Sequence, residues 1–249
     1  CYPRPSYVRS DNEYFTPYYW TGTATGSGQG DMLDHHHELG FVPDLMFIKN
    51  RDNVEQWYAF DSVRGWVYNK GLEPNNSSGE NVAGGRNTYP VGQDNGFTLK
   101  VQDPSSTGGE IDFYGRTYVA YCWKGGGNKG TWNVDGEDRG SAAAAGLTTG
   151  DTSVLTGCSI NTKAGFSIVT YTQDSGGASK NIAHGLSKAP SFVLMKHVNN
   201  TSSWFVNHTA IETVGKIMYL ESNSDQDTSS DFGGAWPGAT YNATSTTGV

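Results

Sequence analysis

The pattern of hydrophobic and polar positions in this chain is dominated by a short apolar run that follows a proline and occurs twice. Leu45–Ile48 follows Pro43, and Phe192–Met195 follows Pro190, with the surrounding residues aligned without a gap at an offset of 147 residues. Proline lacks an N–H and fixes φ, so it can begin a strand but cannot lie in the middle of a sheet. A four-residue run of strand-favouring side chains predicts a strand covered on both faces, with a short helix as the alternative. The repetition predicts two copies of one structural unit.

Alternating segments extend the repeat on both sides of this run. An aromatic segment at 14–22 corresponds to the β-branched segment 165–172, and a second strand at 56–60 corresponds to 203–207. These segments are aromatic or β-branched in both copies, and the offset of 147 residues also pairs Trp57 with Trp204. Further strands are expected at 95–99 and 117–124. Few stretches have helix periodicity, and the best candidates for short helices, 141–147 and 210–220, are both interrupted by glycine.

These elements predict an all-β chain of two tandem, related β-sandwich domains of lectin or jelly-roll type, with long loops. The second repeat is expected to be incomplete, because its last residues align with the beginning of a strand in the first. The expected parts are an extended lead-in at 1–13, a first repeat at 14–127, a Gly/Ala-rich connector at 128–164 and a second repeat at 165–249.

The composition agrees with a loop-rich β protein and excludes some partners. The 249 residues include 33 glycines and 12% aromatic residues, while only 17% are charged. The net charge of −8 argues against nucleic-acid binding, because phosphate contacts need clustered Lys and Arg. No apolar run approaches the roughly 20 residues that a membrane-spanning helix needs, so membrane insertion is not expected.

The three cysteines do not predict a disulfide framework. Reduced thiols in a protein assembled inside a cell are the simplest interpretation, and a Cys122–Cys158 bridge is the alternative. Cys1 at the beginning of the sequence fits either a fragment of a longer protein, which we favour, or a processed lipoprotein.

The run Asp34–Glu38 contains three consecutive histidines and is the best candidate for a metal site. Successive side chains of a strand point to opposite faces, so consecutive histidines do not converge on one ion. Only His37 recurs, as His184, which favours a hydrogen-bonding turn residue in each copy. We therefore predict no metal site, and the glycine-rich segment 26–30 lacks the Lys-Ser/Thr of a nucleotide loop, so no cofactor is predicted either.

No residue is predicted to be catalytic. Asp61 and Arg64 are close in sequence and predict an ion pair that fixes a turn, since a carboxylate and a guanidinium can form two parallel hydrogen bonds. In the second copy, His208 replaces Asp61 and no arginine follows, which favours a local structural role. The chain contains no nucleophile elbow and no Cys–His pair at a recognisable spacing. The predicted structural motif therefore consists of His37, Pro43, Asp61, Arg64, His184 and Pro190.

Several segments together resemble repeats in large structural proteins of marine tailed bacteriophages. They are 61–65, 118–126, the connector 131–147, 165–171 and 184–190, and the resemblance extends over roughly residues 14–249. The resemblance implies a tail-fibre or virion-surface protein with a lectin-like β-sandwich, for which no catalytic residues are expected.

On this basis we expect a non-enzymatic structural component of a phage particle that displays loops for attachment to the host surface. Expected partners are further copies of the chain in a homotrimer, other virion proteins and host glycans, which aromatic faces and amides in the loops are suited to contact. The alternatives are a polysaccharide depolymerase on the particle, which would need two carboxylates at a defined separation, and a host-encoded surface adhesin or lipoprotein.

Overall fold

The structure, a computed structural model, describes residues 13–23, 36–80, 88–101, 111–172, 180–210, 216–225, 227–228 and 240–243. Its described residues form strands and two short 3-10 helices but no α-helix, which confirms the all-β prediction. No helix in these ranges has the length and apolar character to cross a membrane. Most of the lead-in, the glycine-rich segment 26–30, Asp34 and His35 lie outside the described residues.

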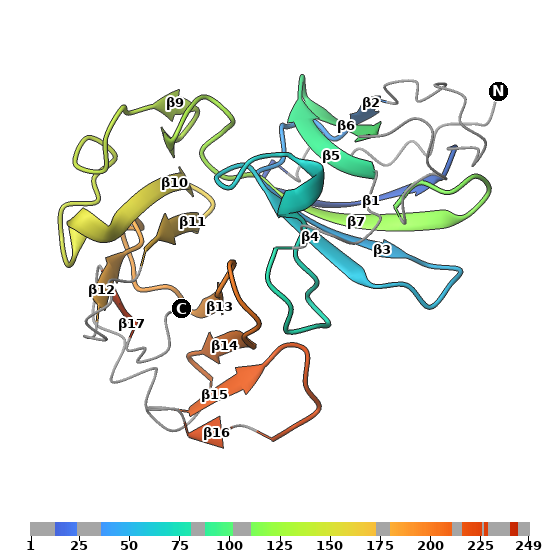
Figure 1. Cartoon of the computed structure of the whole chain (residues 1–249). Coiled ribbons are helices and arrows are strands. Elements are labelled where there is room, and N and C mark those ends of the chain that lie inside the picture. The colour runs from blue at the N-terminus through green and yellow to red at the C-terminus, as the bar shows by residue number, and fades with distance from the viewer. Residues whose placement is uncertain are drawn as a thin grey trace.

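The first repeat contains two sheets that enclose one apolar core (Figure 1). One sheet has the order β1-β7-β3-β4 and the other the order β2-β6-β5. The core is formed by alternate residues of these strands, and Tyr58, Tyr118 and Phe97 are among its largest buried side chains. The strands are β1 Phe15–Thr21, β2 His36–Glu38, β3 Leu45–Asn50, β4 Trp57–Asp61, β5 Thr88–Gln93, β6 Gly96–Val101 and β7 Thr117–Trp123, and the 3-10 helix η1 is Tyr68–Lys70.

The turn of the β5–β6 hairpin follows from the two residues that connect its strands. Gln93 pairs with Gly96, so only Asp94 and Asn95 connect the two strands. Both have positive φ, of 40° and 70°, which Asp and Asn tolerate better than other residues with a side chain. Two-residue connections with positive φ match the twist of paired strands, so this short sequence fixes the register of the hairpin.

The described residues of the second half of the chain form three separate sheets. Their orders are β11-β10-β8-β9, β13-β14-β15-β16 and β12-β17, and only the β8–β10 pair is parallel. The strands are β8 Trp132–Val134, β9 Glu137–Asp138, β10 Leu155–Asn161, β11 Phe166–Tyr171, β12 Lys180–Ala183, β13 Phe192–Lys196, β14 Trp204–His208, β15 Lys216–Tyr219, β16 Asp227–Thr228 and β17 Thr240–Ala243, and the 3-10 helix η2 is Thr152–Val154.

The region predicted to be a connector, 128–164, contributes β8, β9 and β10 to the sheet that contains β11. The helix candidate at 141–147 is a turn, in which Ala145 N–H donates to the Ser141 carbonyl and Gly146 adopts a φ of 80° that ends any helical continuation. The described part of the other candidate, 210–220, contains β15.

The internal repeat is visible in the pairing of strands. In the first repeat Leu45 pairs with Asp61, and in the second Phe192 pairs with His208, so the β3–β4 and β13–β14 hairpins have the same register at an offset of 147 residues. Pro43 and Pro190 each lie two residues before the strand that begins the hairpin. The two apolar runs of the sequence therefore occupy equivalent positions in equivalent hairpins.

Candidate functional site

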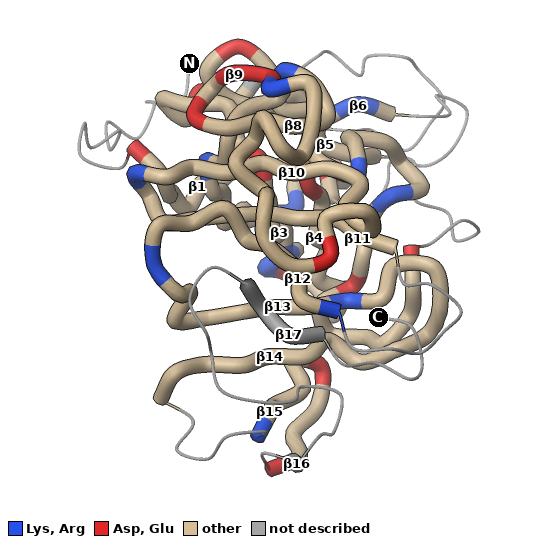
Figure 2. The backbone as a smooth tube through the Cα atoms, turned by 90° about the vertical axis from the view of Figure 1, so that its left-hand side faces the viewer, with Lys and Arg blue, Asp and Glu red and all other residues tan. Residues whose placement is uncertain are grey.

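A groove of about 1380 Å³ lies between the two repeats, and described residues of both provide its walls. One wall is the outer face of β3 and β4, where alternate residues such as Leu45, Phe47 and Ala59 point into it. The other walls are β11 and β13 of the second repeat. Figure 2 shows few charged residues along these two strands, and β11 contains none. The β11 side of the groove is therefore uncharged, whereas Asp61, Arg64, Lys70, Glu80 and Lys196 also line the groove.

Trp204 of β14 fixes the second repeat against the first beside this groove. Its indole N–H lies 2.9 Å from the Glu73 carbonyl and 3.1 Å from the Asn76 carbonyl. The ring packs with Phe47 and Leu72 in a small apolar cluster that spans both repeats. In Figure 1 the loop that follows β4 extends beside β13 and β14, which brings these carbonyls to the tryptophan.

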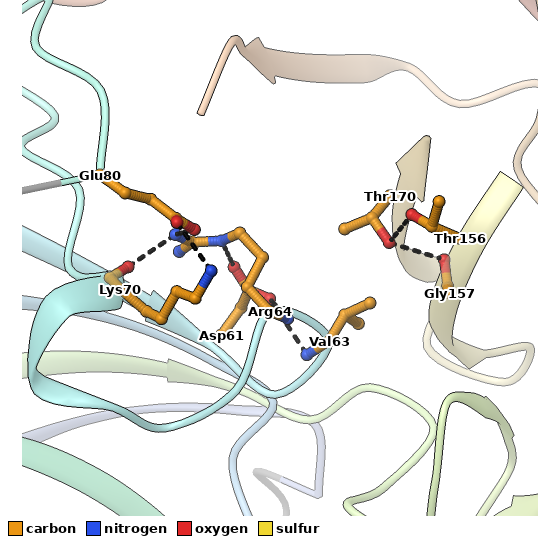
Figure 3. Close-up of polar contacts among 8 residues, drawn as sticks. All are labelled: Asp61, Val63, Arg64, Lys70, Glu80, Thr156, Gly157 and Thr170. Atoms are coloured by element: carbon orange, nitrogen blue, oxygen red, sulfur yellow. Dashed lines mark hydrogen bonds and ion pairs between the residues drawn. The ribbon is translucent and has the colours of Figure 1, made fainter. Parts of the chain in front are cut away.

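A buried ion cluster forms one end of the groove (Figure 3). The Arg64 guanidinium donates to the Asp61 carboxylate at 2.5 Å and to the Glu80 carboxylate at 2.9 Å, and Lys70 also contacts Glu80 at 2.9 Å. Burial works to lower the pKa of Arg64, but the two carboxylates outweigh it and raise that pKa. Both carboxylates are therefore engaged by cations, which leaves neither as an unpaired acid or base.

The same cluster holds the turn after β4. The Asp61 carboxylate accepts hydrogen bonds from the backbone N–H groups of Val63, at 3.1 Å, and Arg64, at 2.9 Å. An aspartate that accepts from the backbone two and three residues ahead stabilises a turn at that point. Opposite the cluster, the Thr156 hydroxyl donates to that of Thr170 at 2.9 Å, which joins β10 to β11 (Figure 3).

Lys196 lies on the wall formed by β13. Its ammonium group donates to the Ser77 carbonyl at 3.2 Å and to the His197 carbonyl at 2.7 Å. Burial lowers the pKa of Lys196 to about 8, and the positive charge of Arg64 acts in the same direction. Burial also lowers the pKa of His197, as does the neighbouring Lys196.

Asp44 is a buried carboxylate that links the first repeat to β10. It accepts hydrogen bonds from the hydroxyls of Ser62 and Ser159, at 2.6 and 2.8 Å, and from the N–H groups of Gly125 and Gly127, at 2.8 and 3.2 Å. Burial raises the pKa of this carboxyl even though these hydrogen bonds work to lower it. All four donors come from segments that are distant in sequence, so the role of Asp44 is to hold these segments together.

The two recurring histidines are both buried but have different surroundings. His37 stacks on Phe97 with ring centroids 4.6 Å apart, and its Nδ1 lies 3.4 Å from the Tyr18 hydroxyl. His184 follows β12, and its Nδ1 accepts a hydrogen bond from Leu186 N–H at 3.1 Å across the turn. Within the described ranges, no three His, Cys, Asp or Glu side chains are grouped so that they could hold a metal ion.

Cys122 and Cys158 are separate free thiols in the interior. Burial raises the pKa of both, that of Cys158 to about 11 with a contribution from Asp138. A thiol with a raised pKa is protonated at neutral pH and is a poor nucleophile. The alternative of a bridge between these two cysteines does not occur in this structure.

A family model described as a domain of unknown function, DUF7483, matches residues 11–248. The chain belongs to the DUF7483 family. Searches of curated proteins and of solved structures find no match to it.

The DUF7483 chain brings together some of the residues predicted from sequence and separates others. Asp61 and Arg64 line the groove directly, and so does His184. Pro190 also lines the groove, whereas Pro43 and His37 are not among its lining residues.

Three features of the site were not predicted from the sequence. They are Glu80 as a partner of Arg64, Trp204 as a contact between the repeats, and Asp44 as a shared hydrogen-bond acceptor. Glu80 has no sequence pattern that connects it to Arg64, 16 residues away. For Asp44, the sequence contains one indication of a special role. The equivalent residue of the second repeat is Ser191, so the carboxylate is present in the first repeat alone.

Proposed function

We propose that this DUF7483 chain is a structural module of a bacteriophage particle, as a tail fibre or capsid-surface protein. In this proposal it consists of two tandem, related β-sandwich units of lectin or jelly-roll type, whose loops are displayed for attachment to the host surface. The phage context rests on the resemblance of its sequence segments to repeats of virion structural proteins.

The observation that carries the proposal is that the repeats have equivalent hairpins and are fixed to one another. The β3–β4 and β13–β14 hairpins have identical register. The Trp204 indole hydrogen-bonds to the Glu73 carbonyl of the other repeat. Repeated units that pack on their neighbours form extended, stiff arrays, and such an array is suited to a fibre or a particle surface. The carboxylates at the groove are engaged by Arg64 and Lys70, which agrees with a structural role for this cluster.

The test is to locate the chain on particles. Antibodies raised against the purified chain, used in immunogold electron microscopy of phage particles that carry it, are expected to label tails or capsids. Recovery of the chain only from host-cell fractions, with unlabelled particles, would contradict the proposal and favour a host adhesin. Release of reducing sugar from host polysaccharide, abolished by a single Asp or Glu substitution, would establish a depolymerase instead.

The proposal includes self-association as a homotrimer, since fibres of tailed phages are built from several identical chains and association covers exposed strand edges. Sedimentation of the purified chain is expected to give the mass of three copies. A monomer at micromolar concentration would contradict this part of the proposal while leaving particle location to be decided by microscopy.

A further inference from the structure

The connection between β5 and β6 contains a chemically labile pair of residues. Asparagine is followed directly by glycine once in the sequence, at Asn95 and Gly96. Asn95 is exposed and has a φ of 70°. In the described part of the chain its side-chain amide makes no hydrogen bond. Asparagine is among the residues that limit the chemical lifetime of proteins, and here its amide is open to solvent and untethered.

The packing of β2 against β6 requires the glycine of this pair. Glu38 of β2 pairs with Gly96, so the two strands approach closely at this point (Figure 1). A Cβ atom at position 96 would overlap with the carbonyl oxygen of His37, and no side chain fits there. The turn in turn favours Asn at position 95, because Asn tolerates positive φ. Packing and turn geometry together therefore place the two residues side by side.

This pair can react without any partner except water. The backbone nitrogen of Gly96 forms a bond to Cγ of Asn95, and the bond from Cγ to the side-chain nitrogen breaks. The proton of the Gly96 N–H leaves with that nitrogen as ammonia, and a cyclic imide remains. Water then opens the ring at either carbonyl, which gives aspartate or isoaspartate. Glycine favours the ring closure, because it has no Cβ to obstruct the attacking nitrogen.

The connection between β8 and β9 provides an internal comparison. Val134 pairs with Glu137, so Asp135 and Gly136 form another short connection with glycine in second place. The Asp135 carboxylate accepts hydrogen bonds from the Thr162 N–H at 2.8 Å and from its hydroxyl at 2.5 Å. Those bonds hold the carboxylate away from the following nitrogen. The Asn95 side chain lacks such a restraint among the described residues.

Exposure alone does not make an asparagine in this chain reactive. Asn75 is exposed, but its side-chain oxygen accepts from the Trp57 N–H at 2.9 Å and its amide nitrogen donates to Gln56. The residue that follows it, Asn76, has a side chain that obstructs ring closure. Asn75 is therefore the matched exposed residue against which Asn95 can be compared.

The backbone carbonyl of Asn95 links the hairpin to the end of β2. It accepts hydrogen bonds from the N–H groups of Leu39, at 2.9 Å, and Gly40, at 3.1 Å. Leu39 is 5% exposed and belongs to the apolar core of the first repeat. A change in the backbone at Asn95 therefore acts directly on the segment that places Leu39 in the core.

Isoaspartate at position 95 would break this arrangement, because it inserts an extra carbon into the backbone. The chain then continues through Cγ, and the former Asn95 carbonyl becomes a charged carboxylate on a side branch. The close contact at Gly96 leaves no space to absorb the extra length on the β6 side. The carbonyl is therefore drawn away from Leu39 and Gly40. The new negative charge also lies next to Asp94, which adds repulsion within the turn.

We propose that Asn95 is a site of spontaneous deamidation whose isoaspartate product releases the end of β2 from the β5–β6 hairpin. The modification is slow and irreversible in the absence of a repair enzyme, so its extent records the age of the molecule. It changes the first repeat locally, at the hydrogen bonds to Leu39 and Gly40, and leaves the sheet that contains β7 intact. This modification site goes beyond the proposed structural function and does not depend on it.

The test incubates the purified full chain in neutral buffer and follows its peptides by mass spectrometry. Methylation by an isoaspartate methyltransferase is the probe for the product. Loss of the amide is expected at Asn95, while Asn75 stays intact. In the aged protein, amide hydrogen exchange at Leu39 and Gly40 is expected to be faster by at least about tenfold, with exchange in β7 unchanged.

Two variants separate the possible causes of faster exchange. Asn95→Gly keeps the positive φ but cannot form the ring, so incubation is expected to leave its exchange at Leu39 and Gly40 unchanged. Freshly purified Asn95→Asp carries the new charge without the extra backbone carbon. Its exchange at these amides is expected to match that of the fresh wild type.

A synthetic peptide of residues 91–99, incubated in parallel, gives the time scale of the unrestrained reaction. An intact Asn95 in the protein after the peptide has reacted would overturn the proposal. So would formation of aspartate alone, or isoaspartate without faster exchange at Leu39 and Gly40. Faster exchange in aged Asn95→Gly would assign the effect to another site and overturn it as well.

Discussion

The indole of Trp204 in the second repeat donates a 2.9 Å hydrogen bond to the carbonyl of Glu73 in the first. The ring is 4% exposed and packs against Leu72 and Phe47, so one side chain supplies both a buried polar contact and apolar area. Trp57 is its equivalent in the first repeat, but there the ring is only partly buried and stacks on Tyr121 at 6.0 Å. The same repeated tryptophan is therefore a contact between repeats in one copy and a surface residue of a sheet in the other.

Trp204→Ala is expected to destabilise the protein by about 3–5 kcal/mol, the usual cost of removing a large buried aromatic side chain. The carbonyls of Glu73 and Asn76 also lose their shared donor. Urea unfolding followed by far-ultraviolet circular dichroism measures this loss.

Trp57→Ala is the matched control for this prediction, since it removes the same side chain from the equivalent strand position. We expect a clearly smaller loss, because Trp57 is only partly buried. Equal losses for the two variants would contradict the assignment of Trp204 as the contact that holds the repeats together.

Arg64→Met is expected to cost about 3–5 kcal/mol, because it leaves the buried carboxylates of Asp61 and Glu80 without their shared cation. Arg64→Lys keeps the charge but loses the planar arrangement of donors, so an intermediate loss is expected. Chemical denaturation of the two variants at neutral pH provides the comparison. A loss below about 1 kcal/mol for Arg64→Met, typical of exposed pairs, would show that the cluster does not act as a buried network.

The elements that sequence predicted well are those with strong apolar patterns. The runs after Pro43 and Pro190 became β3 and β13, and the aromatic segment before Gly22 became β1. These strands have period-two patterns or apolar runs that only a buried sheet satisfies, and their repetition adds a second, independent indication.

The strands of the presumed connector were not predictable, because polar residues occupy buried positions in them. Asn133 is 1% exposed, and its side-chain oxygen accepts from the N–H groups of Lys129 and Gly130. Ser159, also buried, donates to Asp44 in the first repeat. Polar side chains that are satisfied by distant partners leave no apolar periodicity in the local sequence.

The candidate site was predictable only where its residues are close in sequence. Asp61 and Arg64 are three residues apart, so their pairing could be foreseen. The groove instead brings together β3, β4, β11 and β13, which belong to three different sheets. Pairing between distant segments is set by tertiary structure and is not encoded in any local pattern.

Asp44→Asn is expected to destabilise the protein by about 1–3 kcal/mol. The four hydrogen-bond donors around Asp44 share its two carboxylate oxygens, whereas an asparagine amide has only one oxygen that can accept. Ser62→Ala is the graded control, since it removes a single hydrogen bond to Asp44 and is expected to cost about 1 kcal/mol. Thermal or urea unfolding of the two variants measures which one loses more stability. A larger loss for Ser62→Ala than for Asp44→Asn would contradict the role of Asp44 as the common acceptor.

The lowered pKa of Lys196 predicts a pH-dependent stability that is specific to this residue. Burial lowers the pKa from 10.5 to about 8, so between these values the unfolded chain binds a proton that the folded chain has released. The folded state therefore gains stability relative to the unfolded state as the pH rises through this window, and below about pH 8 it carries the cost of a buried charge.

Lys196→Met removes this group. As the pH rises from about 8 to 10, the wild type is therefore expected to gain unfolding free energy relative to the variant. Taking the difference cancels the titration of tyrosines and thiols that both proteins share. Lys49→Met, at the equivalent position of the first repeat, is the matched control. The Lys49 ammonium contacts the Asn50 and Asn53 carbonyls at 2.7 and 3.3 Å. If the Lys196 difference were flat over this range, or if Lys49→Met showed the same slope, burial of Lys196 at the groove would not be the cause.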